Sequence, residues 1–435
     1  MQRRNFLAQA STLALSTGWL SACGGGGSTD TPTTSPVVST PPGTTAKSRV
    51  IVVGGGMGGA TVAKYLRLWG DAIDVTLVER QSSYTSHIMS SLVLSGQRSL
   101  GSLAYGHDAL RSRYGVNVVL GDVVGIDPVG VKVTLASGQV LSADRIVLAP
   151  GIEFDAVPGL GTSDRMPHAW QAGPQTSLLA SQLAAMPSGG TAILSIPKVP
   201  YRCPPGPYER ACLLADWMKL NKPGSKLLVL DANPDFVTEK DNFSQAFHGL
   251  HANVIQYVPN AEVTQVDPVA MTLNTPQGQF KGDVVNLIPR QRAGTVITTN
   301  GLANATEGRF AGVNVLSYAS TMAGAGKVHV IGDSSATTQP KAGHIANQEA
   351  KVCADAIVRL LAGGSPDPAP VTSSACYSTI TMGQASWLTA VFQYDAASAS
   401  MQAVAASSAA SVGWSSGDFR DMGTWFNALM ADSFA

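Results

Sequence analysis

The chain has 435 residues, of which 44% are hydrophobic and 13% are charged, with 29 basic and 29 acidic side chains. At about 150 residues per domain, this length predicts roughly three domains. Zero net charge argues against a nucleic-acid-binding protein, because phosphate binding needs a surplus of Lys and Arg on one face. No run of about 20 apolar residues occurs outside the N-terminus, which argues against an integral membrane protein.

The N-terminus is typical of an export signal. The pair Arg3-Arg4 precedes a mildly apolar stretch, a pattern that indicates the twin-arginine route for folded proteins. The sequence Leu-Ser-Ala-Cys that ends at Cys23 resembles a lipoprotein cleavage box, and ordinary signal cleavage near the same place is the alternative. We therefore expect a signal over residues 1–22, a flexible tether over residues 23–46, a periplasmic protein, and no membrane attachment beyond a lipid at Cys23.

A glycine-rich turn follows the first strand-like run of the chain. Residues 49–53 are mostly β-branched and lead into a GxGxxG pattern whose glycines are Gly54, Gly56 and Gly59. In this pattern the turn lets a pyrophosphate approach the backbone at the N-terminus of the helix that follows. The second strand-like run ends at Glu79, about 20 residues after the last glycine, where an acid binds the adenosine ribose. The spacing predicts a strand, turn, helix and strand that bind NAD or FAD.

Two later strands favour FAD over NAD. A β-branched run ends in a small-residue turn at Ala149 and Gly151, and resembles the second fingerprint of flavoproteins with two dinucleotide domains. The run that ends at Gly332-Asp333 resembles the segment whose aspartate holds the ribityl-phosphate part of FAD in that superfamily. A helix predicted over residues 342–361 would direct its positive N-terminal end at the flavin ring.

A second dinucleotide site is expected to be missing. Residues 191–196 predict a strand and residues 211–220 predict a helix, the elements that flank a second GxGxxG turn in pyridine-nucleotide disulfide reductases. The connecting segment 197–210 instead contains five prolines and one glycine. Prolines lack the N–H groups that a pyrophosphate needs. The sequence therefore predicts a second dinucleotide-like domain without an NAD site, with Cys203 in place of the nucleotide turn.

The segment around Cys203 is also the most specific motif of the chain. The run Arg-Cys-Pro-Pro-Gly-Pro-Tyr-Glu-Arg at residues 202–210 resembles the flavoprotein subunit of flavocytochrome c sulfide dehydrogenase, a relative of the sulfide:quinone oxidoreductases. The likeness covers essentially the whole mature chain and includes motifs at residues 52–61, 167–170, 286–289, 291–294 and 375–378. It implies an α/β fold with two Rossmann-like dinucleotide-binding domains of the disulfide-reductase flavoprotein type, a C-terminal interface domain, and FAD as the cofactor.

The resemblance implies a redox-active disulfide between Cys203 and Cys376 beside the flavin. Counting the four cysteines that follow Cys23 allows three pairings, and a purely structural bridge is the alternative. The redox role is favoured because Cys203 replaces a loop that faces the flavin in the parent fold. Cys212 and Cys353 lie in apolar helical segments and are predicted to be small buried side chains.

The resemblance also implies a reaction, the oxidation of sulfide. Hydrosulfide would attack one sulfur of the bridge and leave a persulfide on one cysteine and a thiolate on the other. The thiolate of Cys376 would then reduce FAD, and Glu209 would carry the proton of the hydrosulfide. The alternative for Glu209 is a surface ion pair with Arg210. The sequence contains no Cys-x-x-Cys-His haem motif, so the expected electron acceptor is a separate c-type cytochrome.

One position departs from the family pattern. Where the family has a cysteine linked covalently to a flavin methyl group, this chain has His87, in the sequence Tyr-Thr-Ser-His. A histidine can also form such a bond, yet an imidazole is a weaker nucleophile than a thiolate. We therefore expect non-covalent FAD, with a histidyl link at His87 as the alternative.

These anchors predict the organisation of the whole chain. An FAD-binding domain covers residues 47–165 and 284–361, a second dinucleotide-like domain covers residues 166–283, and a C-terminal domain covers residues 362–435. Apolar residues at helical spacing near the end of the chain predict a helix with one apolar face, which packs on its own core or contacts a cytochrome or a membrane. These residues are Phe419, Met422, Trp425, Phe426, Leu429 and Met430. No metal site is predicted.

Two other functions remain open from the sequence. A sulfide:quinone oxidoreductase would share the site, but the sequence lacks the pair of strongly apolar C-terminal helices expected for membrane insertion. A non-catalytic electron-transfer subunit would use the disulfide only for structure. The presence of Cys203, Cys376 and Glu209 together favours the enzyme.

Overall fold

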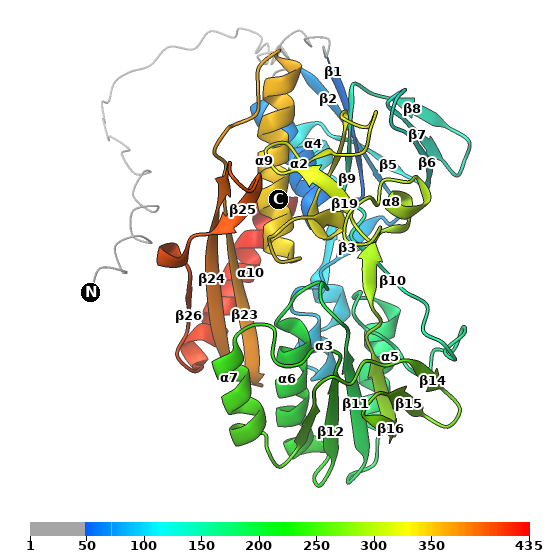
Figure 1. Ribbon diagram of the computed structural model, residues 1–435, viewed down its shortest axis with the longest axis vertical. Coiled ribbons are helices and arrows are strands. Elements are labelled where there is room, and N and C mark those ends of the chain that lie inside the picture. Colours follow the sequence, from blue (N-terminus) through cyan, green and yellow to red (C-terminus); the bar gives the residue numbers. More distant parts are fainter. Residues whose placement is uncertain (1–47, 71) are drawn as a thin grey trace, which may run out of the picture. The chain divides into compact units, whose positions relative to one another are not determined.

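The structure is a computed structural model that describes residues 48–70 and 72–435 (Figure 1). The predicted export signal, the tether and the lipid site at Cys23 lie outside the described residues. The largest sheet has eight strands in the order β22-β19-β20-β21-β9-β1-β2-β5, and its strands from β21 to β5 pair in parallel. The strands are β1 (Ser48–Val53), β2 (Ile73–Glu79), β5 (Asn117–Leu120), β9 (Arg145–Leu148), β19 (Ala311–Asn314), β20 (Ala319–Ser320), β21 (Val328–Val330) and β22 (Ser335–Ala336).

This sheet is buried on both faces, which explains the β-branched runs in the sequence. Alternate residues of β1 project to opposite faces. Val50 and Val52 join a hydrophobic core with two helices, whereas Ile51 and Val53 join a core covered by a small antiparallel sheet. The covering elements are α2 (Met57–Trp69), α9 (Gly343–Leu361), β6 (Val123–Asp127), β7 (Lys132–Leu135) and β8 (Val140–Ser142).

The GxGxxG turn brings α2 into contact with the end of β1. A Cβ atom on Gly59 would lie 1.7 Å from the carbonyl oxygen of Gly54, so only glycine fits at this crossing. Gly54 itself has a φ of +95°, in the left-handed region that favours glycine. Helix α2 also packs along α9. The strand, turn, helix and strand predicted from the spacing are therefore present.

A second parallel sheet, in the order β13-β12-β11-β17, lies in the segment between the two halves of the first. The strand predicted over residues 191–196 is β11. The helix predicted over residues 211–220 is α6, but it begins earlier, at Gly206. A helix tolerates proline in its first turn because the N–H groups there have no partner within the helix, and Pro207 occupies that turn. The elements are α5 (Pro174–Ala185), β11 (Thr191–Ile196), α6 (Gly206–Asn221), β12 (Lys226–Asp231), α7 (Lys240–Gln245), β13 (Ile255–Val258), β14 (Gln265–Asp267), β15 (Thr272–Thr275), β16 (Gly278–Lys281) and β17 (Val284–Leu287).

Short elements connect the two sheets. Strands β10 and β18 form an antiparallel pair where the chain leaves the first sheet and returns to it. Strands β3 and β4 form another pair after β2. The connecting elements are β3 (Ser83–Thr85), α3 (Ser91–Leu94), β4 (Ala104–Gly106), α4 (Asp108–Tyr114), β10 (Ile152–Phe154), β18 (Gln291–Ala293) and α8 (Thr295–Thr299).

The C-terminal part forms an antiparallel sheet and a long helix. The sheet has the order β23-β24-β25, with β26 paired to β24. Apolar residues of α10 enter the core that contains α2 and α9, so this face packs on the protein's own core; they are Met422, Phe426, Leu429, Met430 and Phe434. Phe419 and Trp425 are only partly buried against it. The elements are β23 (Val371–Thr381), β24 (Gln384–Asp395), β25 (Ser400–Ala403), β26 (Ala409–Ala410) and α10 (Ser416–Phe434).

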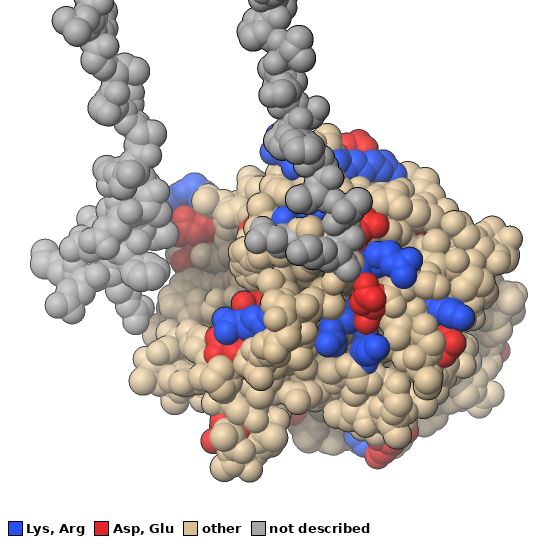
Figure 2. All heavy atoms as spheres, turned by 90° about the horizontal axis from the view of Figure 1, so that it is seen from above, with Lys and Arg blue, Asp and Glu red and all other residues tan. Residues whose placement is uncertain are grey.

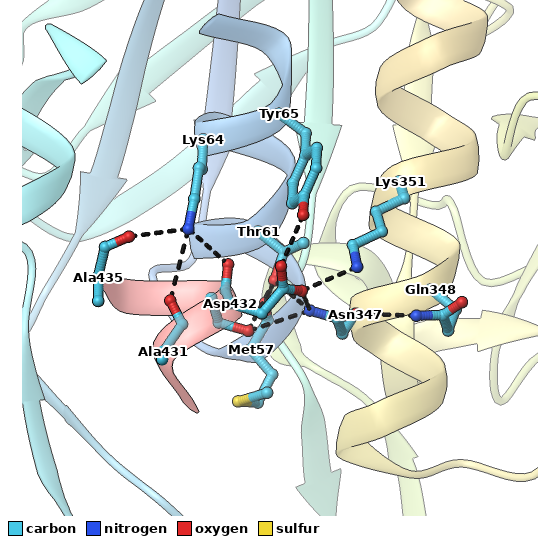
Figure 3. Close-up of polar contacts among 11 residues, drawn as sticks. Met57, Thr61, Lys64, Tyr65, Asn347, Gln348, Lys351, Ala431, Asp432 and Ala435 are labelled. Carbon is cyan, nitrogen blue, oxygen red and sulfur yellow. Dashed lines mark hydrogen bonds and ion pairs between the residues drawn. The ribbon is translucent and has the colours of Figure 1, made fainter. Parts of the chain in front are cut away.

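Lys64 of α2 fixes the end of α10 (Figure 3). Its Nζ donates hydrogen bonds to the carbonyl oxygens of Ala431, Asp432 and Ala435, at 3.4, 2.9 and 2.8 Å. A helix C-terminus leaves such carbonyls without partners and carries a partial negative charge. One ammonium group therefore satisfies the end of α10 and attaches it to α2.

The Asp432 carboxylate completes this attachment. It accepts hydrogen bonds from Tyr65 of α2 at 2.6 Å and from Asn347 of α9 at 2.8 Å, and it pairs with Lys351 at 2.8 Å (Figure 3). Charge-assisted hydrogen bonds of this kind are stronger than neutral ones. The last helix is thus held on the two helices that lie beside the first sheet.

Charged side chains are sparse and mixed in sign on the surface. On the face shown in Figure 2, Lys and Arg side chains lie among Asp and Glu side chains, separated by uncharged surface. This distribution agrees with the equal numbers of acids and bases in the sequence. Within residues 48–70 and 72–435, no helix has the length and hydropathy needed to cross a bilayer.

Replacing Asp432 by Ala is expected to reduce the free energy of unfolding by about 1–3 kcal/mol, because three partly buried donors lose their acceptor. Denaturant titration followed by circular dichroism measures this change. Asp421→Ala removes an exposed acid of the same helix and should leave the midpoint unchanged. Equal midpoints for the two variants would contradict the role given to Asp432.

Candidate active site

A cavity of about 1130 Å³ is lined by residues of the first parallel sheet, of the loops and helix starts of the second domain, and of the C-terminal part. Every residue predicted to bind or act on a cofactor, except Gly59, lines this cavity. They are Gly54, Gly56, Glu79, His87, Ala149, Gly151, Cys203, Glu209, Gly332, Asp333 and Cys376. Gly59 lies behind the turn, where it packs α2 against β1. The fold therefore brings the predicted residues together in one place.

One part of the cavity fits a dinucleotide. The N-terminus of α2 at Gly56 has no side-chain cap, so its N–H groups are open to a phosphate. The Glu79 carboxylate accepts hydrogen bonds from the N–H groups of Gly55 at 2.5 Å and Gln81 at 2.9 Å, which hold it at the end of β2. Helix α9 also begins without a side-chain cap, at Ala342, and this residue lines the same cavity. The N-terminus of α2 fits a pyrophosphate, and that of α9 fits an electron-rich ring.

Buried charges surround Asp333. Burial raises the pKa of its carboxyl, and the charges of Arg202 and Lys341 oppose this shift. Burial also lowers the pKa of Lys341 to about 8. Glu349 accepts a hydrogen bond from the N–H of Gly332 at 2.6 Å, and burial raises its pKa to about 8.

Sequence reasoning gave a role only to Asp333 in this group. No motif marks Lys341, which lies in a loop. For Glu349 a signal was present, because it occupies the buried face of α9 together with Ile345, Ala346 and Cys353. An acid on the apolar stripe of an amphipathic helix indicates a buried partner.

Cys203 and Cys376 line the cavity from different parts of the chain. Cys203 has a φ of +58°, and its N–H donates a hydrogen bond to the carbonyl of Lys341 at 2.6 Å. Cys376 lies in strand β23. Both are free thiols in this structure, as are Cys212 and Cys353. Cys212 and Cys353 are fully buried, in agreement with their predicted role as packing residues.

Burial raises the pKa of both cavity thiols. For Cys203 the pKa lies well above its ordinary value, and the charge of Glu209 adds to the effect of burial. For Cys376 burial raises the pKa to about 12, and the charge of Glu239 is the next contribution. Both sulfurs are therefore protonated in the reduced protein at neutral pH.

Glu209 is a buried acid in the first turn of α6. Burial raises its pKa to about 8. The expected alternative, a surface ion pair with Arg210, is wrong. Arg210 is 1% exposed and donates instead to Ser91 at 3.2 Å, Asn286 at 2.9 Å and the carbonyl of Ala169 at 2.9 Å. Because Arg210 is used to join three segments, Glu209 remains available to the cavity.

His87 is held as a neutral imidazole in the cavity wall. Burial lowers its pKa well below the ordinary value, with the charge of Arg202 as the next cause. The Nδ1 atom accepts a hydrogen bond from the N–H of Ala172 at 2.8 Å. The ring proton therefore lies on Nε2.

The segment 197–210 has its backbone groups committed elsewhere. The N–H of Gly206 donates to the carbonyl of Cys203 at 2.8 Å, and the N–H of Cys203 donates to Lys341. Pro205 and Pro207 have no N–H to offer. The prolines and these two hydrogen bonds leave the turn with fewer free N–H groups than the glycine turn before α2, which is the physical basis for expecting no NAD site here.

Two family models match the chain. Residues 176–289 match the model described as the sulfide dehydrogenase (flavocytochrome c) flavoprotein chain, central. The resemblance to this family is thereby confirmed. Residues 48–172 match the pyridine nucleotide-disulphide oxidoreductase model. Both matches are to families of oxidoreductases, and together they cover nearly all of residues 48–289.

Solved structures share the fold at low sequence identity. The sulfide:quinone oxidoreductase of Aquifex aeolicus aligns with a TM-score of 0.72 and 17% identity, over 89% of this chain and 91% of that one. An NAD-dependent persulfide reductase from A. fulgidus aligns with a TM-score of 0.61 and 12% identity, over 88% and 77%. A chain of the covalent putidaredoxin reductase–putidaredoxin complex aligns with a TM-score of 0.61 and 17% identity, over 80% and 82%. These likenesses confirm the predicted disulfide-reductase flavoprotein fold.

Acid denaturation is expected to release FAD from the polypeptide, because the neutral imidazole of His87 is a weaker nucleophile than the cysteine thiolate of the family. Gel electrophoresis followed by flavin fluorescence measures this, and the expected protein band is dark. A fluorescent band, with a flavin-sized mass on the peptide that contains His87, would establish a histidyl link. A variant His87→Ala distinguishes this link from flavin attached elsewhere.

Proposed function

We propose that the protein oxidises sulfide through a disulfide between Cys203 and Cys376 and passes the electrons through FAD to a c-type cytochrome. The observation that carries the proposal is that Cys203, Cys376 and Glu209 line the same cavity as the dinucleotide-binding glycines. The match of residues 176–289 to a family named for flavocytochrome c supports the haem partner. Because the sequence contains no Cys-x-x-Cys-His motif, the proposed haem would belong to another chain.

The cofactor would be held by groups that the structure already presents to the cavity. The pyrophosphate fits the turn at Gly54 and Gly56, before α2, and the ribose fits Glu79. Asp333 fits the ribityl chain, and Ala149, Gly151 and Gly332 allow close approach of the backbone. When bound, FAD accepts an electron pair and releases electrons singly.

The chain's own residues supply the sulfur chemistry. Hydrosulfide attacks the Cys203 sulfur, and a new sulfur–sulfur bond forms there as the bond to Cys376 breaks. The electron pair of the broken bond stays on Cys376 as a thiolate. Glu209 takes the proton of the hydrosulfide, so the product on Cys203 is a persulfide anion. Because burial disfavours a thiolate at Cys376, this sulfur readily bonds to the outer sulfur of the persulfide on Cys203, and the two electrons released in forming that bond would pass to FAD.

The proposal includes the place of the reaction. The paired arginines at the N-terminus support export of the folded protein to the periplasm, and Cys23 would supply a lipid anchor. Export of the folded protein suits a flavoenzyme, since FAD is acquired before the chain leaves the cytoplasm.

The direct test is sulfide-dependent reduction of cytochrome c by the purified, FAD-loaded protein. We expect cytochrome reduction that requires both sulfide and bound FAD. Reduction of a soluble quinone but not of cytochrome c would overturn the haem partner and favour the quinone-linked reaction. No reduction of bound FAD by sulfide would overturn the enzymatic proposal and favour a structural bridge.

Replacing Cys376 by Ser should lower the rate of FAD reduction by sulfide by a factor on the order of 10³ or more, because the leaving thiolate is lost. FAD should stay bound, since the glycine turn is untouched. Stopped-flow absorbance measures the rate, and Cys353→Ala is the control. Mass spectrometry of the unreduced wild type should join Cys203 to Cys376 and leave Cys212 and Cys353 free; any other pairing contradicts the mechanism.

The rate of FAD reduction should rise with pH around pH 8, after correction for the fraction of hydrosulfide. Glu209 is protonated below its raised pKa of about 8 and cannot then accept a proton. Glu209→Gln should lower the rate by about 10²–10⁴-fold and remove this rise. Glu262→Gln, at an exposed acid of the second domain, is the control. A Glu209→Gln profile with the wild-type rise would exclude Glu209 as the proton acceptor.

A further inference from the structure

A second carboxyl group near Cys376 has no part in the chemistry above. Glu239 is the residue before helix α7 and has a φ of +43°, a conformation that costs a non-glycine residue free energy. Its side chain makes no capping hydrogen bond to α7. Instead, one carboxylate oxygen accepts from the hydroxyl of Ser378 at 2.6 Å and the other from that of Ser386 at 2.7 Å. The carboxyl is therefore directed at the C-terminal sheet and away from its own helix.

The two serines place this carboxyl beside Cys376. Ser378 on β23 and Ser386 on β24 are cross-strand partners, and both are fully buried. Cys376 lies two residues before Ser378, so both side chains project from the same face of β23. Two residues of a strand span about 6–7 Å. Glu239 is thus held at the face of β23 that carries Cys376, and its charge adds to the rise in the pKa of that thiol.

The hydrogen bonds favour the charged form of Glu239. Separations of 2.6 and 2.7 Å are typical of hydroxyl groups that donate to a carboxylate. Burial raises the pKa of Glu239, and the bonds from Ser378 and Ser386 oppose that shift. An ionised carboxylate is kept in a buried place only where such partners hold it.

No cation neutralises this charge among the described groups around it. The charge of Glu239 acts on Glu209 and Cys212 of α6 and on Cys376 of β23. Asp216 and Lys219 of α6 also act on Cys212, and Lys240 and Asp241 follow Glu239 in α7. The two lysines are engaged elsewhere, Lys219 with Asp216 at 3.9 Å and Lys240 with Asp235. The charge of Glu239 therefore acts on the cavity groups.

We propose that Glu239 is a positioning residue that disfavours the thiolate of Cys376 and so drives its electron pair toward the flavin. The inference rests on the proposed function, in which opening of the bridge leaves a thiolate on Cys376. A negative charge nearby raises the free energy of that thiolate. A dithiol pair whose thiolate is destabilised is a stronger reductant, because the oxidised form is relatively favoured.

The same charge has opposite effects on two successive steps. When the bridge opens, Cys376 is the leaving group, and a less stable thiolate leaves more slowly. In the next step the Cys376 thiolate and the persulfide anion on Cys203 form a sulfur–sulfur bond and give two electrons to the bound FAD. The carboxylate of Glu239 favours this step, because it removes negative charge from Cys376. A merely structural residue would not move the two rates in opposite directions.

The test is Glu239→Gln in the FAD-loaded protein, because Gln keeps a donor and an acceptor for the two serines. In the reduced protein, the rate at which iodoacetamide alkylates Cys376 should rise on the order of tenfold at a fixed pH below the thiol pKa. Peptide mass spectrometry assigns the alkylated residue. Against a dithiothreitol buffer, the ratio of dithiol to disulfide for Cys203 and Cys376 should stay near that of the wild type at neutral pH, where both reduced sulfurs are protonated, and should rise above it only as the pH approaches the thiol pKa. With sulfide, bridge opening should become faster and FAD reduction slower.

Three further variants separate charge from structure. Ser386→Thr changes the packing at the clamp but keeps a hydroxyl donor for the carboxylate, and Asp241→Asn removes an exposed charge from α7; both should keep the alkylation rate of Cys376 near that of the wild type. Glu239→Thr removes the charge without preserving the clamp and should act like Glu239→Gln.

An alkylation rate unchanged in both Glu239 variants would overturn the inference. This readout needs no sulfide, so it is separate from the test of the proposed function. Failure of the wild type to reduce FAD with sulfide would overturn that function, whereas the alkylation rates would still decide whether Glu239 controls Cys376.

Discussion

The contact between Gly59 and the carbonyl of Gly54 determines where the cavity lies. Because no side chain separates the two backbones there, α2 begins directly at the end of β1 with its N–H groups facing outward. Helix α9 packs along α2, and α10 is fixed to both by Lys64 and Asp432. One backbone crossing therefore positions three helices, and residues of all three line the cavity.

Burial favours the neutral forms of several titratable groups in the cavity wall. It raises the pKa of Glu209 to about 8, raises those of both thiols, and lowers that of His87. Because an isolated charge is costly in such surroundings, an electron pair that enters is accompanied by the movement of a proton. This coupling suits a substrate that brings both, as hydrosulfide does.

The sequence predicts the parts of the site whose signals are local. The β-branched runs mark β1, β2 and β11, the glycine spacing marks the turn before α2, and the Cys203 motif marks the cavity wall. The sequence does not predict that α6 begins at Gly206. The five prolines of residues 197–210 indicate a loop, although a helix tolerates proline in its first turn.

Roles that depend on distant contacts could not be predicted in this way. Arg210 is adjacent to Glu209 in the sequence, yet its partners are Ser91, Asn286 and Ala169. From the sequence alone, Glu239 would be predicted to be an ordinary surface acid. Its role depends on a cross-strand pair of serines that lies well over a hundred residues later in the chain. Local sequence patterns predict the helices and strands. Buried polar pairs instead depend on how helices and strands that are distant in the sequence pack together.

The order of strands in the first sheet also bears on how the protein is made. Strand β9 ends at residue 148, and its parallel neighbour β21 begins at residue 328, after the whole second domain. During synthesis, the edge of β9 stays without this neighbour until the later segment leaves the ribosome. The cavity wall extends further still, to Trp425. The complete cofactor site therefore forms late in synthesis. FAD can bind to it only after most of the chain has left the ribosome.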